Sequence, residues 1–143
     1  MDFVEGVRKT LFLSKGFQNK IFVIKVSGKL VEDPALLSNL LSDVVFLNKL
    51  GVRPLIVHGA GKQIDLEYAK LGLEKKLVDG LRYTDERGLE VIKSVLKGIN
   101  QSIDEKIVEL GGESAAFDGV GQFVVKAVKK TIGSTGVPTD YGF

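Results

Sequence analysis

Two apolar segments that each end in a glycine turn constrain the fold of this chain more than any other feature. They are residues 21–28 (IFVIKVSG) and residues 54–61 (PLIVHGAG). A run of Ile, Val and Phe bounded by glycine is typical of a buried strand in a parallel sheet. One helical segment separates the two runs, so we expect both turns at the same edge of that sheet. Open α/β sheets bind their ligands at this edge.

The remaining sequence alternates between helical and extended patterns. Helical patterns are found at 2–14, 34–49, 61–71, 85–97 and 99–110. We expect Gly98 to mark a kink or a break between the last two. Short extended patterns are found at 77–83, 114–117 and 122–128, and residues 131–142 have the composition of a loop. Strands that alternate with helices predict a layered α/β fold with parallel pairing.

The composition limits the functions open to this chain. A formal net charge of +2 on 143 residues is too small to indicate binding to nucleic acid or to an anionic membrane. The sequence has no cysteine and a single histidine, which excludes disulfides, thiolate metal sites and multi-histidine metal sites. No apolar run approaches the roughly 20 residues that cross a bilayer, and residues 1–6 lack the pattern of a signal peptide. We therefore predict a cytoplasmic protein without a metal site of its own.

The first glycine turn carries a candidate catalytic residue. Lys25 lies inside the apolar segment, shortly before Gly28. A lysine beside a turn whose amides hold an anion suits phosphoryl transfer, where catalysis consists of positioning the moving group and neutralising its charge. The alternative is a lysine at a strand end that reaches solvent. The chain contains no G-x-x-x-x-G-K-[ST] pattern, so this turn is not a P-loop.

Two other positions are candidates for binding an anionic ligand. Gly59 and Ala60 lie where the second strand enters a helix, and the first amides and the dipole of a helix attract anions. Arg82 lies directly before another expected helix, and arginine binds carboxylates through two N–H groups. For Arg82 the alternative is a surface ion pair with Asp85 or Glu86.

In combination, four stretches resemble the amino-acid kinase family and, within it, the acetylglutamate kinases. They are FVIKVSG (22–28), SDVVFLNKLGVRPLIVHGAG (42–61), VDGLRYTDERGLEVIKSVLKGIN (78–100) and IVELGGESA (107–115). The resemblance implies a three-layer αβα sandwich with a mainly parallel sheet. It also implies ATP-dependent phosphorylation, with Mg²⁺, of the side-chain carboxylate of N-acetyl-L-glutamate, a step of arginine biosynthesis.

The resemblance further implies roles for individual residues. Lys25 matches the family lysine that stabilises the transferring phosphoryl group, and Gly28 matches the turn beside the ATP phosphates. Gly59 and Ala60 match the pair whose backbone amides hold the substrate. Arg82 matches the arginine that grips a substrate carboxylate.

The same resemblance divides the chain into an N-terminal helix (1–15) and the substrate-binding half of a kinase domain (16–143). The second half of the family domain, which supplies most of the ATP pocket, a catalytic aspartate and a second lysine, has no counterpart here. We therefore expect residues 1–143 alone not to turn over ATP. The segment 2–14 resembles the extra helix of arginine-regulated members, which implies a homo-oligomer, a dimer or a hexamer, and L-arginine as a candidate feedback inhibitor.

Departures from the family pattern keep two alternatives open. Ser27 and Ala60 stand where the kinases usually have glycine, and Lys62 stands where proline is frequent. Val120-Gly121 falls where many of these kinases have Lys-Asp. Ala60 and the Gly-Val pattern near residue 120 resemble the kinase-like domains of N-acetylglutamate synthases, which indicates a non-catalytic or regulatory domain that binds arginine or acetylglutamate. The other alternative is a kinase for aspartate, protein-carried aminoadipate or a carbamate, which the segment 80–85 disfavours.

Overall fold

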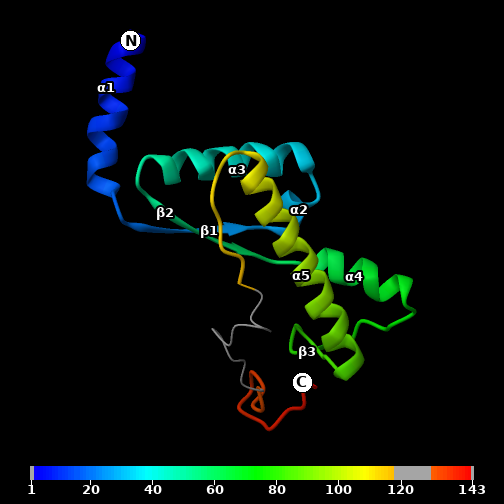
Figure 1. Ribbon diagram of the computed structural model, residues 1–143. Helices are drawn as coiled ribbons and strands as arrows, with labels where there is room; N and C mark the ends of the chain where they lie inside the picture. The colour runs from blue at the N-terminus through cyan, green and yellow to red at the C-terminus, as the bar shows by residue number, and fades with distance from the viewer. Residues whose placement is uncertain (1, 118–129, 143) are drawn as a thin grey trace. The chain divides into compact units, whose positions relative to one another are not determined.

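The computed structural model describes residues 2–117 and 130–142, and it divides into two compact units (Figure 1). The first unit comprises Met1–Gly59 and Ser102–Ala115, and the second comprises Ala60–Gln101 and Ala116–Phe143. Among the described residues, no helix is both long enough and apolar enough to span a membrane.

A parallel pair of strands forms the centre of the first unit. Strand β1 (Ile21–Val26) pairs with β2 (Arg53–His58), in a register that sets Val26 opposite His58. The peptide N–H of Gly59 donates to the carbonyl of Val26 over 3.3 Å, just beyond the ladder. Both glycine turns therefore follow their strands at the same sheet edge, which confirms the predicted parallel pairing.

Helix α3 (Pro34–Lys49) covers one face of this sheet (Figure 1). The Asp33 carboxylate caps the helix by accepting from the N–H groups of Ala35 and Leu36, both at 3.0 Å, and Pro34 fits the first helical position. The helix ends before Gly51, whose φ of +89° favours glycine. The apolar face of α3, the end of β1 and the residue before β2 contribute these buried side chains to the unit: Val26, Leu37, Leu41, Val44, Val45 and Val52.

The other face of the β1–β2 pair is exposed within the first unit. Alternate residues of β1 and β2 point to it, and its apolar members are between 46% and 67% exposed: Ile21, Val23, Leu55 and Val57. Lys25 lies on the same exposed face, opposite Val57 in the register. A sheet with one face packed on a helix and a second apolar face agrees with the predicted layered α/β class.

The N-terminal segment is helical, as its amphipathic pattern predicts. Helix α1 (Phe3–Ser14) leads into the short 3₁₀ helix η1 (Lys15–Phe17), and neither contains a buried residue. Figure 1 shows α1 standing clear of the β1–β2 sheet. A one-turn helix that the sequence did not predict, α2 (Gly28–Val31), follows β1 directly.

The second unit begins with α4 (Gly61–Lys70), which buries Ile64 and Tyr68. The expected single extended segment at 77–83 is instead an antiparallel hairpin of β3 (Leu77–Val78) and β4 (Leu81–Arg82). The turn residues Asp79 and Gly80 have φ of +50° and +74°. Asp-Gly between apolar residues is a strong hairpin signal, because both positions of such a turn need positive φ.

Helix α5 (Glu86–Glu109) corrects the prediction of two helices separated at Gly98. The helix is continuous over 24 residues and includes Gly98. Ile99, Ile103 and Ile107 are buried at helical spacing along α5. Packing of this face outweighs the cost of one interior glycine, which is about 1 kcal/mol.

The region after α5 corrects a second prediction. Residues 112–117 contain no strand, so the extended segment expected at 114–117 is wrong. The N–H of Gly112 closes the helix end on the carbonyl of Ile107 over 2.9 Å, and the Ser114 hydroxyl donates to Asp104, so this segment folds back on α5 rather than onto the sheet. The expected strand at 122–128 and the Val120-Gly121 pair lie outside the described residues. The loop predicted at 131–142 is confirmed for the described part.

Candidate active site in two parts

The first part of the candidate site is the pair of sheet-edge turns, formed by Ser27-Gly28 after β1 and Gly59 after β2. Gly28 is the first residue of α2, with Ser27 in extended conformation before it. A Cβ placed on Gly59 would meet no atom within 4 Å, so open space adjoins the backbone there. Lys25, two residues before Ser27, and Lys29, directly after Gly28, are both exposed cations near the first turn. The turns thus offer backbone next to a lysine, which is an arrangement suited to a phosphate group.

Ala60 is the first residue of the second unit, and the backbone conformation at this position does not require glycine. Its φ of −139° and ψ of 20° are accessible to alanine, and the residue is buried. Its carbonyl accepts the N–H of Ile64 over 2.8 Å, so Ala60 stands at the N-terminal end of α4. The replacement of a family glycine by alanine therefore leaves a peptide N–H at this position without backbone strain.

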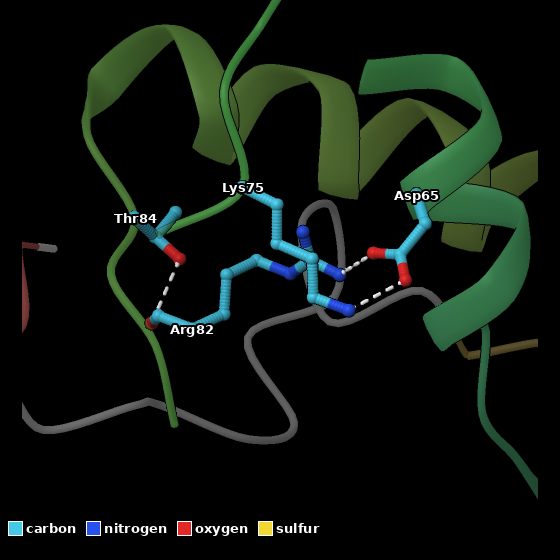
Figure 2. Close-up of polar contacts among 4 residues, drawn as sticks. All are labelled: Asp65, Lys75, Arg82 and Thr84. Carbon is cyan, nitrogen blue, oxygen red and sulfur yellow. Dashed lines mark hydrogen bonds and ion pairs between the residues drawn. The ribbon is translucent and has the colours of Figure 1, made fainter. Parts of the chain in front are cut away.

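The second part is a group of side chains around Arg82 that we call the arginine cluster: Asp65, Tyr68, Lys75 and Arg82. The Asp65 carboxylate projects from α4 and each of its oxygens carries one contact (Figure 2). Oδ1 accepts from Nη2 of Arg82, and Oδ2 accepts from Nζ of Lys75 over 2.7 Å. The expected alternative for Arg82, a surface ion pair with Asp85 or Glu86, is wrong, because the partner lies on α4.

Aromatic contact and burial complete the environment of Arg82. Its Cζ lies 4.9 Å from the centre of the Tyr68 ring, within the range of a cation–π contact. The Arg82 side chain is 16% exposed, and its carbonyl accepts the Thr84 hydroxyl over 3.4 Å. Beside the cluster lies a cavity of about 180 Å³, lined by Tyr68, Leu73, Glu74, Lys76, Tyr83 and Asp85.

The charges of the arginine cluster do not cancel. The hydrogen bond from Arg82 and, to a smaller extent, that from Lys75 hold the pKa of the Asp65 carboxyl below its ordinary value. Asp65 is therefore ionised at neutral pH and faces two cations. Within these four residues one positive charge remains in excess, while Glu74, Lys76 and Asp85 line the cavity beside them.

The structure places the predicted site residues in two groups. Lys25, Gly28 and Gly59 belong to the first unit, and Ala60 and Arg82 belong to the second. Sequence reasoning missed the partners of Arg82, because Asp65 is 17 residues away and Lys75 is 10 residues from Asp65. One signal in the sequence could have pointed to these partners: Asp65 lies early in the helix α4, and Lys75 and Arg82 follow it in the chain. In residues 2–117 and 130–142, no group of three or more His, Cys, Asp or Glu side chains is placed to hold a metal ion.

Comparison with known proteins identifies relatives of this chain. A family model described as the amino acid kinase family matches residues 20–136. The acetylglutamate kinase of Thermoanaerobacter pseudethanolicus is 39% identical over 118 residues, which is 82% of this chain and 40% of that protein. The acetylglutamate kinase of Archaeoglobus fulgidus is 33% identical over 148 residues, which is 100% of this chain and 51% of that protein. The chain thus spans between 40% and 51% of the length of these two relatives.

Two solved structures share the fold. N-acetylglutamate synthase from Neisseria gonorrhoeae, in complex with coenzyme A and N-acetyl-glutamate, aligns with a TM-score of 0.64 and 24% identity over 77% of this chain and 26% of that chain. The same enzyme in complex with coenzyme A and L-arginine aligns with a TM-score of 0.58 and 21% identity over 92% and 28% of the respective chains. At these identities the likeness concerns the fold, and it agrees with the predicted α/β class.

Proposed function

The chain belongs to the amino acid kinase family, and on this premise we propose that its residues 16–143 form the N-acetyl-L-glutamate-binding half of an acetylglutamate kinase. The reaction would transfer a phosphoryl group from ATP to the side-chain carboxylate of N-acetyl-L-glutamate, as a cytoplasmic step of arginine biosynthesis. Relatives named acetylglutamate kinase that match 82% and 100% of the chain support this choice within the family.

The observation that carries the proposal is the parallel pairing of β1 with β2. It brings the sheet-edge turns to one edge, with Lys25 on the strand that leads into the first turn. Phosphoryl transfer between two anions needs fixed positions and offset charge more than any covalent step by the protein. An edge that presents backbone amides and a lysine supplies both.

In this proposal the sheet-edge turn at Gly28 faces the ATP phosphates, and Lys25 offsets the charge that develops on the transferring phosphoryl group. The open space beside Gly59 leaves its backbone accessible, and Ala60 keeps a peptide N–H at the start of α4. We assign the backbone at Gly59 and Ala60 to N-acetyl-L-glutamate, and a ligand would have to replace the bond between the Gly59 N–H and the Val26 carbonyl. Mg²⁺ would arrive with the nucleotide and neutralise phosphate charge.

Arg82 is assigned to the carboxylate of N-acetyl-L-glutamate that does not react. A guanidinium fork matches a carboxylate in shape and charge, and the excess positive charge of the arginine cluster supports this role. The reacting carboxylate has to be free for the phosphoryl group, so the α-carboxylate is the group left for Arg82. This division gives the ligand one orientation.

Calorimetry on the purified 143-residue chain tests the proposal. We expect N-acetyl-L-glutamate to bind, and Arg82→Ala to weaken its affinity about 10-fold to 100-fold, because a charged hydrogen bond is lost. Arg53→Ala is a matched control, since Arg53 is an exposed arginine on β2. Absence of binding to the unaltered chain, or equal affinity in the Arg82 variant, would contradict the proposal. ADP release is not expected from this chain alone.

A kinase-like domain that binds arginine or acetylglutamate for a synthase is the second candidate. The fold likeness to the synthase structures and the unstrained alanine at position 60 favour it. L-arginine in the same calorimeter separates the two functions. Binding of L-arginine without any binding of N-acetyl-L-glutamate or ATP would favour the second candidate and count against the first.

We also propose that the chain forms a homo-oligomer through α1. The apolar side chains of this helix are exposed at 42% to 82%: Phe3, Val4, Val7, Leu11, Phe12 and Leu13. Exposed apolar surface of this kind marks an interaction site in soluble proteins. Deletion of residues 2–14 is expected to lower the mass measured by light scattering from a hexamer to a dimer. An unchanged mass would reject this role of α1.

A further inference from the structure

The guanidinium of Arg82 is fixed from two directions. Its Nη2 donates to the Asp65 carboxylate on α4 (Figure 2). Its Cζ lies 4.9 Å from the centre of the ring of Tyr68, on the same helix. The backbone of Arg82 is held by β4, where this residue pairs with Leu77 of β3. Three anchors on a long side chain leave it little rotamer freedom.

The remaining terminal nitrogen of Arg82 is buried and has no partner. Nη1 makes no hydrogen bond to any residue in 2–117 or 130–142. A buried guanidinium N–H without an acceptor is unfavourable, and such groups are normally satisfied. The bond to Asp65 uses Nη2, so no acceptor among the described residues satisfies Nη1, and a ligand carboxylate could do so only if the atoms that cover this nitrogen move.

Tyr68 is itself held in a fixed place. It is 4% exposed, and its hydroxyl makes no hydrogen bond within the described part of the chain. A Cβ placed on Gly88 would overlap that hydroxyl, so a glycine in the first turn of α5 makes room for the ring. The N–H of Gly88 donates to the Asp85 carboxylate over 2.7 Å, which fixes this turn. The ring is thus a rigid support under Arg82.

Lys75 adds a second positive charge to the arginine cluster. Asp65 alone would cancel the charge of Arg82, but Lys75 bonds to the second carboxylate oxygen at 2.7 Å. The cluster keeps an excess positive charge while Asp65 holds Arg82 in place. An acidic partner therefore orients the arginine without removing its attraction for an anion.

We propose that Asp65 and Tyr68 are positioning residues that hold the Arg82 guanidinium in place for the ligand carboxylate. The inference rests on the proposed function, since it takes that carboxylate to be the α-carboxylate of N-acetyl-L-glutamate. Asp65 and Tyr68 act through Arg82 and do not touch the ligand. The opposite role for Asp65, as a competitor that occupies Arg82 in place of the ligand, makes the reverse prediction for its removal.

Calorimetry with N-acetyl-L-glutamate on the full 143-residue chain gives the first test. Asp65→Asn and Tyr68→Leu are each expected to weaken binding about tenfold, with Asp65→Glu recovering part of the loss. Tyr68→Phe is the conservative variant: it keeps the ring and removes a hydroxyl that has no hydrogen bond within the described residues, so it is expected to retain the affinity that Tyr68→Leu loses. Affinity that is unchanged or higher in Asp65→Asn would overturn the proposal.

A change of ligand separates positioning from general damage. With the α-amide of N-acetyl-L-glutamate, which lacks the carboxylate assigned to Arg82, Asp65→Asn is expected to cause no further loss of affinity. An equal loss for both ligands would mean that Asp65 serves only the fold, and the proposal would fall.

Nuclear magnetic resonance without any ligand gives a second, independent test. The Tyr68 ring current is expected to move the Arg82 side-chain protons upfield in the unaltered chain and in Tyr68→Phe. The shift is expected to disappear in Asp65→Asn and Tyr68→Leu. If the chain fails to bind N-acetyl-L-glutamate, the proposed function falls while these spectra still decide the positioning. A shift that persists in Asp65→Asn overturns the positioning whatever the ligand result.

Discussion

The sheet-edge turns and the arginine cluster are two ways of recognising an anion. The turns present backbone, and their places follow from where β1 and β2 end in the register. The cluster presents side chains from α4, from the segment after it and from β4. Backbone sites depend on the integrity of the sheet, whereas the cluster depends on a few contacts between side chains. Substitutions should therefore disturb the two regions in different ways.

The largest expected effect is on the sheet that carries the turns. Leu41 of α3 is fully buried, so Leu41→Ala is expected to lower the free energy of unfolding by about 2–5 kcal/mol. Denaturant unfolding measures this loss, and hydrogen exchange should show reduced protection of the β1 and β2 amides. Leu36→Ala on the same helix is the control, because Leu36 is 54% exposed. Equal losses for the two variants would contradict a core centred on Leu41.

A medium effect is expected where the arginine cluster is packed most tightly. Gly88→Ala would place a methyl group against the Tyr68 hydroxyl, and such overpacking costs about 1–3 kcal/mol. It should also displace the ring from Arg82 and weaken binding of N-acetyl-L-glutamate. Adding Tyr68→Phe removes the overlapping oxygen, so the double variant should recover most of the stability and affinity.

Thermal unfolding and calorimetry on the single and double variants of Gly88 and Tyr68 decide this point. The two residues are in contact, so a non-additive result is expected. Strictly additive losses would show that Gly88 does not serve to accommodate the ring. The sheet-edge turns offer no equivalent rescue, because a Cβ at Gly59 would meet no side chain within 4 Å.

Local sequence patterns predicted the first region well for a physical reason. Apolar runs, the Asp33-Pro34 helix start and Gly51 after the helix are signals that act within a few residues. The helix expected at 34–49 and the two expected strands appear in the structure close to their predicted positions. The same local reasoning failed at Gly98, because it used only the low helix propensity of glycine. The buried isoleucines of α5 stabilise the helix through packing, and that packing cannot be read from a local pattern.

The arginine cluster could not be predicted in the same way. Arg82 was recognised as a candidate from its place before a helix, but its partners come from other elements. Ion pairs such as that with Asp65 depend on tertiary structure and leave no periodic pattern in the sequence. The Asp79-Gly80 pair is a hairpin signal in the sequence. Using it would have predicted that Arg82 lies on the second strand of a hairpin and not in a single extended segment.

The smallest expected effect concerns a carboxylate outside the cluster in the same unit. Asp79 accepts the N–H of Ser134 over 3.0 Å and the Tyr141 hydroxyl over 2.8 Å, and these bonds, the first more than the second, lower the pKa of its carboxyl. A lowered pKa in the folded state means that the stabilisation is present above the ordinary pKa of an aspartate. It is lost as the pH falls through the folded value.

Asp79→Asn is therefore expected to reduce the acid sensitivity of unfolding by a small amount, with little change in N-acetyl-L-glutamate affinity. Unfolding of both proteins at pH 7 and near pH 3 measures the difference between the two pH values. Asp43→Asn is the matched control, because Asp43 is an exposed aspartate on α3. If Asp79→Asn weakened ligand binding as strongly as Asp65→Asn, the loop at 131–142 and the arginine cluster would act as one recognition site. The side-chain site would then include the β3–β4 hairpin and the loop at 131–142 in addition to the arginine cluster.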